Sequence, residues 1–182
     1  MLVSFSVSNF RSFGEEVTLS MVASNRYSDH STHVMSLPGG DRSVVRTAVI
    51  YGANAAGKSN LVKAMEYAQK WILGAAGRLS AVDAHAFQPN ARAKPSSFEF
   101  RFVANGRIFA YGFDVTRHSI QGEWLALVGA EDDEVIFERN ADGHTKVDEA
   151  ILKKRFPNDT KIINLLTSLS KNDLNDSQLF IE

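Results

Sequence analysis

The sequence contains no cysteine among its 182 residues. The chain therefore forms no disulfide and offers no thiolate metal site, and this absence suits a reducing cytoplasm. No apolar run approaches the roughly 18–20 residues that span a bilayer, and the N-terminus lacks the basic start and apolar core of a signal peptide. We therefore expect a soluble, cytoplasmic protein without a membrane partner.

An excess of charge of either sign is also missing. Twenty Lys+Arg oppose 21 Asp+Glu, a formal net charge of -1, so binding to DNA or an anionic membrane would need a local patch. The basic run at 153–155 fits a helix C-terminus better than a DNA contact. Hydrophobic residues at 44% and charged residues at 23% are typical of a globular domain. They exclude a disordered tail, a coiled coil and a collagen-like repeat.

The N-terminal quarter of the sequence predicts strands. Apolar residues alternate with polar ones at 3–7 and again at 17–21, as in half-buried strands. Residues 24–41 are polar and contain Pro and Gly, which indicates a loop. Residues 43–51 are rich in β-branched apolar side chains, which favours a strand buried on both faces.

The rest of the chain predicts one helix, an antiparallel meander and a helical tail. Apolar residues at helical spacing indicate a helix over 58–73, and Asn105-Gly106 between two alternating runs indicates a tight hairpin. The remaining predicted elements are strands near 98–103, 107–115, 120–128 and 135–139 and helices near 148–156 and 159–170, separated by Pro157.

The predicted elements give an α/β fold that we divide into three parts. Residues 1–75 hold the N-terminal strands, the phosphate loop described below and its helix. Residues 76–148 hold the antiparallel meander, and residues 149–182 hold a helical tail. The length suits one domain or a piece of a larger one, and the apolar run at the C-terminus suggests a truncated domain.

The central motif is a phosphate-binding loop at residues 52–59, which satisfies G-x-x-x-x-G-K-[ST]. Small residues there let backbone N–H groups surround phosphates at a helix N-terminus. Lys58 is expected to reach the β- and γ-phosphates and Ser59 to ligate Mg²⁺. A chance match is expected in about 1% of chains this long. The motif therefore predicts nucleotide binding, with Gly52, Ala55, Ala56, Gly57, Lys58 and Ser59 as candidate ligands.

The residues around the loop resemble a known family. Asn54 and residues 57–60 are similar to the G-x-N-x-x-G-K-S-N loop of ABC-type ATPase heads of the SMC, RecF and OLD-like AAA kinds. Residues 9–13, Asn-Phe-Arg-Ser-Phe, resemble the segment that those families carry after their first strand. The resemblance implies a P-loop NTPase fold in which a central sheet carries the loop and a meander packs alongside.

The same resemblance supplies the expected function. It implies Mg-ATP binding, with Arg11 and Ser12 beside the phosphates and Asn54 and Asn60 lining the pocket. It also implies hydrolysis in the complete protein, through dimerised heads or a missing C-terminal lobe, and a role in phage defence or DNA metabolism, with DNA or a defence effector as partner.

Several parts of such an ATPase are missing from the sequence. Residues 125–128 are apolar, but Gly129-Ala130 separate them from Glu131-Asp132, so an Asp-Glu motif for Mg²⁺ and water is absent and a hairpin turn is favoured. Gln88 and Gln178 are weak candidates for the glutamine that senses Mg²⁺. A module that binds nucleotide or a partner without hydrolysis therefore stays open, as does, less favoured, a GTPase or kinase.

Overall fold

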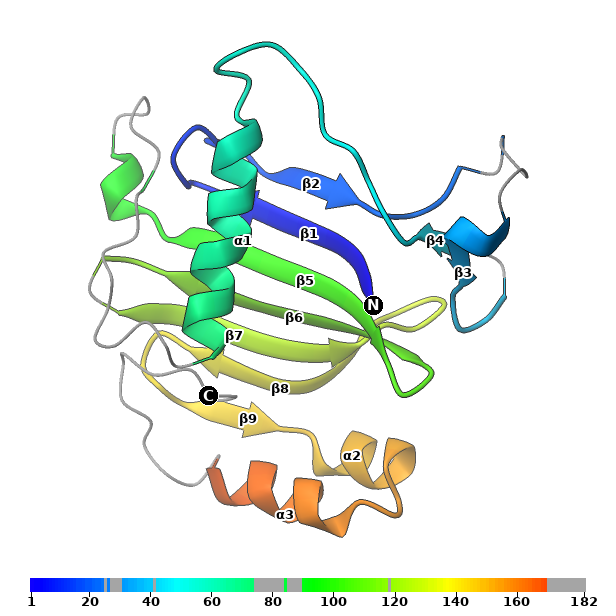
Figure 1. Cartoon of the computed structure of the whole chain (residues 1–182). Helices are drawn as coiled ribbons and strands as arrows, with labels where there is room; N and C mark the ends of the chain where they lie inside the picture. The colour runs from blue at the N-terminus through cyan, green and yellow to red at the C-terminus, as the bar shows by residue number, and fades with distance from the viewer. Residues whose placement is uncertain are drawn as a thin grey trace.

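The computed structural model describes residues 1–24, 26, 31–40, 42–73, 84, 90–117 and 119–169. It is a mixed α/β structure dominated by one seven-stranded antiparallel sheet in the order β2-β1-β5-β6-β7-β8-β9 (Figure 1). The strands of this sheet are β1 (Leu2–Ser8), β2 (Val17–Ser20), β5 (Ser96–Ala104), β6 (Arg107–Val115), β7 (Ile120–Leu127), β8 (Glu134–Asn140) and β9 (Thr145–Val147).

The N-terminal strands and the meander form a single sheet, because β1 pairs with β5 as well as with β2. This pairing joins residues about ninety positions apart, such as Phe5 and Phe100. The expected meander is confirmed from β5 to β8 and gains β9. Asn105 and Gly106, with φ of 49° and 70°, form the tight turn between β5 and β6, as the sequence predicted.

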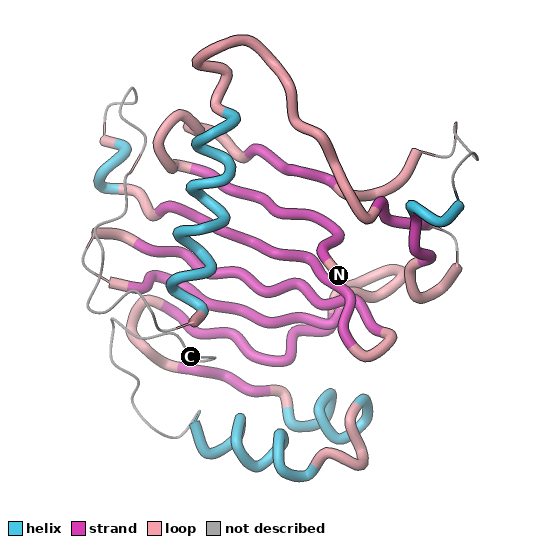
Figure 2. Tube along the Cα trace, in the orientation of Figure 1, coloured by secondary structure: helices cyan, strands magenta, loops and turns pink. Residues whose placement is uncertain are grey.

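Helix α1 (Lys58–Ile72) crosses one face of the sheet (Figures 1 and 2). Its buried face supplies Leu61, Ala64, Ala68 and Trp71 to the core. The strands oppose it with aromatic side chains, because every second residue of β5 and β6 points to this face. The aromatic side chains of β5 and β6 that pack in the hydrophobic core with α1 are Phe98, Phe100, Phe102, Tyr111 and Phe113.

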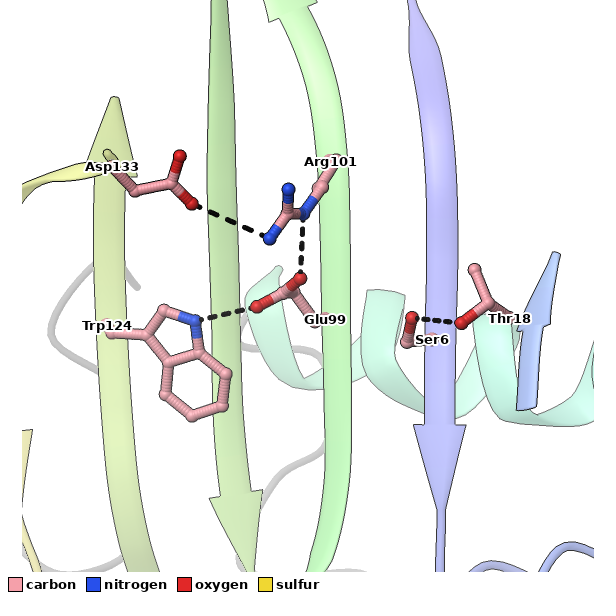
Figure 3. A network of polar contacts seen from close by, with 6 residues as sticks. All are labelled: Ser6, Thr18, Glu99, Arg101, Trp124 and Asp133. Carbon is pink, nitrogen blue, oxygen red and sulfur yellow. Dashed lines mark hydrogen bonds and ion pairs between the residues drawn. The ribbon is translucent and has the colours of Figure 1, made fainter. Parts of the chain in front are cut away.

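The opposite face of the sheet carries a network of polar contacts (Figure 3). Glu99 accepts hydrogen bonds from Trp124 Nε1 at 3.1 Å and from Arg101 Nε at 3.1 Å, and Arg101 also reaches Asp133. The indole of Trp124 lies against Gly112, where an added Cβ would come within 2.3 Å of the ring. A side chain at this position would displace the indole, so glycine lets the Trp124 ring lie against β6.

Helices α2 (Glu149–Arg155) and α3 (Thr160–Leu169) follow the sheet and confirm the helices predicted near 148–156 and 159–170. Asp148 begins α2 by accepting a hydrogen bond from Ile151 N at 3.0 Å, as an N-cap does. A cavity of about 910 Å³ lies between α1, the sheet and these two helices, and its lining is almost entirely apolar. Within the described part of the chain, no helix is both long and apolar enough to cross a bilayer.

The prediction of a buried strand over 43–51 was wrong. Only β4 (Ser43–Val45) is a strand, and it pairs with β3 (Val34–Ser36) in a separate two-stranded sheet. The region 24–41, predicted as loop, holds β3 and the short helix η1 (Ser31–His33). Residues 46–51 are outside any strand, and Val49 and Tyr51 are 81% and 90% exposed. An apolar run is buried on both faces only where neighbouring strands flank it, and no described strand pairs with these residues.

Candidate nucleotide-binding site

The phosphate-binding loop, residues 52–59, connects this exposed segment to α1. Gly57 precedes the helix with φ of 91°, a left-handed conformation that glycine adopts without steric cost. Ala55 is also left-handed, with φ of 65°. The ammonium of Lys58 turns back over the loop and donates to the carbonyls of Gly52 at 2.7 Å and Ala53 at 2.8 Å. The lysine cation therefore lies within the curve of the loop.

The start of α1 is suited to an anion. The first N–H groups of a helix have no acceptor within it and carry partial positive charge. In α1 the N–H groups of Asn60 and Leu61 bond back to Gly57 O, and the first turn contains no acidic residue. Residues 52–56 and Ser59 are exposed. Phosphate oxygens can therefore approach both the N-terminus of α1, which has no side-chain cap, and the Lys58 cation.

A second turn, residues 9–14, lies next to the loop. Phe10 and Phe13 exchange backbone hydrogen bonds of 2.9 Å each and enclose Arg11 and Ser12. Arg11 has φ of 52°, which is uncommon for a residue with a long side chain. Among described residues other than Gly and Asn, only Arg11 and Ala55 have positive φ. The unusual backbone is thus concentrated in these two neighbouring loops.

Direct contacts join the turn to the phosphate loop and α1. Asn60 Nδ2 donates to Ser12 Oγ at 2.9 Å. A Cβ added at Gly57 would lie 3.3 Å from Ser12 Oγ and 3.5 Å from the Phe13 ring, so the turn packs on the glycine itself. The ring of Phe10, which is 2% exposed, packs 5.5 Å from that of Tyr67. Ser12 therefore lies beside the loop, and Arg11 is its neighbour in the same turn.

The acidic cluster at 131–134 lies elsewhere. It occupies the turn between β7 and β8, as the hairpin interpretation predicted. Because β1, β6 and β8 run one way and β5 and β7 the other, this turn lies at the opposite end of the sheet from residues 9–14. No group of three His, Asp or Glu side chains suited to a metal occurs among the described residues.

The basic run at 153–155 is engaged with carboxylates. Arg155 forms two hydrogen bonds with Glu134, from Nε at 2.7 Å and Nη2 at 2.8 Å, and Lys153 pairs with Glu149. The guanidinium lowers the pKa of the Glu134 carboxyl below its ordinary value of 4.5. The run therefore ties α2 to the edge of β8, in agreement with the helix-end interpretation.

Comparison with protein families decides the class of this site. A family model described as "AAA domain, putative AbiEii toxin, Type IV TA system" matches residues 48–181, which is more than half of the chain. The chain belongs to this AAA family. The match begins just before the phosphate loop and identifies the chain as a P-loop AAA-type ATPase domain. A search of curated proteins finds no match.

The structure of this AAA domain places most of the predicted site residues together. Residues 52–60 form one loop and helix start, and the Arg11–Ser12 turn adjoins them through Ser12. Asn54 is exposed in the loop. Gln88 and Gln178 lie outside the described residues. Sequence reasoning gave no role to Asn9 or Phe13, although an asparagine at the start of a turn is a recognised signal.

Proposed function

We propose that the chain binds Mg-ATP through residues 52–60, as the head of an ATPase. The observation that carries the proposal is the position of the Lys58 ammonium over the loop at the N-terminus of α1. Each of the two groups attracts phosphate oxygens by itself. Together they favour a polyphosphate, since one cation and one helix N-terminus can hold successive phosphates.

The roles of the individual residues follow from their chemistry. Lys58 would offset charge on the β- and γ-phosphates, and backbone N–H groups of residues 55–58 would surround the α- and β-phosphates. Asn54 and Asn60 would line the pocket. Arg11 and Ser12 would lie beside the phosphates, a role supported by the hydrogen bond from Asn60 to Ser12.

The donors available fit a magnesium ion only in part. Ser59 is exposed at the first turn of α1, and its hydroxyl is an oxygen ligand of the kind that Mg²⁺ accepts. Bound there, Mg²⁺ would neutralise phosphate charge. Since the described residues place no carboxylate cluster at the loop, the remaining ligands would be phosphate oxygens, water or groups from another segment or subunit.

The finer family assignment also belongs to the proposal. The docking of the Asn-Phe-Arg-Ser-Phe turn on the phosphate loop supports an ABC-type head of the SMC, RecF or OLD-like kind. Hydrolysis would then require a second head or a C-terminal lobe. The family description names an AbiEii toxin and a toxin–antitoxin system, which supports a role in defence more than one in DNA metabolism.

Substitution of Lys58 tests nucleotide binding. We expect Lys58→Ala to abolish Mg-ATP binding measured by calorimetry, because the loop loses its cation. Lys63→Ala is a matched control, since Lys63 is exposed on the same helix one turn further on. Unchanged affinity in Lys58→Ala would contradict the proposal, and tighter binding of GTP than of ATP would favour a GTPase.

A module that binds nucleotide without hydrolysing it is the alternative for this chain alone. The position of the acidic turn at the far end of the sheet favours it, because the carboxylates of that turn do not face the phosphate loop, where they could activate water. Phosphate release by the isolated chain that disappears in Lys58→Ala would refute this alternative.

A further inference from the structure

The side chain of Asn9 holds the turn that carries Arg11 and Ser12. Its Nδ2 lies within hydrogen-bond distance of three carbonyl oxygens, those of Ala91 at 2.7 Å, Lys94 at 2.9 Å and Pro95 at 3.1 Å. Asn9 is 6% exposed; its contact with Ala91 O is buried, and those with Lys94 O and Pro95 O are partly buried. They connect the turn to the segment that leads into β5.

The backbone of Asn9 is fixed as well. Its carbonyl accepts a hydrogen bond from the hydroxyl of the fully buried Ser96, and its N–H donates to Gly14 O at 3.3 Å. Its φ of 49° is a left-handed conformation that asparagine tolerates better than most residues. The side-chain contacts therefore require an amide donor, and the backbone conformation favours asparagine or glycine.

Hydrogen bonds therefore hold the turn from two sides. Asn9 attaches it to residues 91–96, and Asn60 attaches it to the first turn of α1 through Ser12. The left-handed conformation of Arg11 is costly for a residue with a Cβ. It persists where surrounding contacts impose it, and the bonds of Asn9 are among the nearest such contacts.

We propose that Asn9 is a positioning residue for the nucleotide site: it holds the Arg11–Ser12 turn against the phosphate loop and so raises the affinity for Mg-ATP. This inference rests on the proposed function. An amide donor is essential to it, because an aspartate would face three carbonyl oxygens with a charge in place of a donor.

The test measures Mg-ATP affinity by calorimetry in Asn9→Gly, which keeps the backbone conformation and removes the amide. We expect a loss of about tenfold, because the two hydrogens of Nδ2 no longer bond to the carbonyls of residues 91–95 and each such bond contributes about 1 kcal/mol. Asn105→Gly is the matched control, since Asn105 has the same φ of 49° in a hairpin at the other end of the sheet. It should bind like the wild type.

A double-mutant experiment separates positioning from general damage to the fold. In an Arg11→Ala/Ser12→Ala background, Asn9→Gly should change the affinity less than twofold, because the groups that it positions are gone. Ser96→Ala, which removes the hydroxyl bonded to the Asn9 carbonyl, should weaken binding about threefold. If Asn9→Gly does not fold, the affinity of Ser96→Ala is used to test the inference instead.

Two results would overturn the inference. One is wild-type affinity in Asn9→Gly or, if that variant does not fold, in Ser96→Ala. The other is an undiminished tenfold loss in the Arg11→Ala/Ser12→Ala background. If the wild-type chain itself binds no Mg-ATP, the proposed function fails and this inference with it. Wild-type binding that disappears in Lys58→Ala but is unaffected in Asn9→Gly or Ser96→Ala would remove this inference alone.

Discussion

The two ends of the seven-stranded sheet are built on different principles. At one end the β5–β6 hairpin turns through Asn105 and Gly106, residues that adopt positive φ readily. At the other end the turn at 9–14 places Arg11 in a left-handed conformation and is held by contacts to α1 and to residues 91–95. Local preference is enough for the first turn, whereas the second depends on distant partners.

This difference supports the proposed position of the nucleotide site. A turn that follows local preference needs nothing else from the molecule, so its conformation carries no information about a ligand. A turn held against local preference by distant contacts is maintained for some other reason, and such conformations concentrate at functional sites. Both described non-Gly, non-Asn residues with positive φ, Arg11 and Ala55, lie in the proposed nucleotide site.

The largest expected effect comes from adding one methyl group at each end. Gly57→Ala would bring a Cβ within 3.3 Å of Ser12 Oγ and push that side chain away from the loop, whereas a Cβ at Gly106 meets nothing within 4 Å. Both residues have positive φ, so each substitution should lower the free energy of unfolding by about 1 kcal/mol. Only Gly57→Ala should also reduce Mg-ATP affinity, by more than tenfold. Calorimetry gives the Mg-ATP affinity of each variant, and denaturant unfolding gives its stability. Equal affinities in the two variants would contradict the proposed difference between the two ends of the sheet.

A smaller effect is expected from relaxing the backbone of the site turn. Arg11→Gly should raise the free energy of unfolding by up to about 1 kcal/mol, because glycine accepts the left-handed conformation. The same change should weaken Mg-ATP binding several-fold. Stability gained together with affinity lost would show that the strain serves the site. A loss of stability in urea unfolding would show instead that Arg11 is a structural residue.

The smallest effect concerns the ion pair that ties α2 to β8. Arg155 lowers the pKa of Glu134 in the folded protein. The ion pair therefore stabilises the fold at a pH above the pKa that Glu134 has in the unfolded chain, and this stabilisation is lost as the pH falls through the lowered pKa of the folded state. The melting temperature of Glu134→Gln should therefore be lower than that of the wild type at pH 7. The two melting temperatures should converge well below pH 4.5. Glu149→Gln, which removes an exposed helix pair, is the control with a smaller difference. Nucleotide affinity should stay unchanged in both variants. A loss of affinity in Glu134→Gln would contradict the idea that the two ends of the sheet act independently.

Sequence patterns predicted the local elements of this fold well. The period of apolar residues located α1 and strands β5 to β8, Asn105-Gly106 located the hairpin, and Pro157 separated α2 from α3. The phosphate loop was evident because its function requires particular residues at fixed spacing. Each of these signals is contained within a few neighbouring residues.

The features that sequence reasoning missed depend on contacts between distant residues. The pairing of β1 with β5 has no local signature, so one continuous sheet was not expected. The apolar run at 46–51 was predicted as buried from composition alone, but burial requires flanking strands that the described residues do not provide. The bonds of Asn9 to residues 91–95 were likewise invisible in the sequence.

The two tryptophans of the chain lie on opposite faces of the sheet, one per face. Trp71 is 4% exposed on α1, packed near Phe113, whereas Trp124 lies over Gly112 with its indole bonded to Glu99. In a Trp124→Phe variant the remaining indole emits from the helix that begins at the phosphate loop. Its intrinsic fluorescence then reports on the packing of α1 against the sheet. A nucleotide that moves the helix on binding would change this emission, so binding could be followed without an added label.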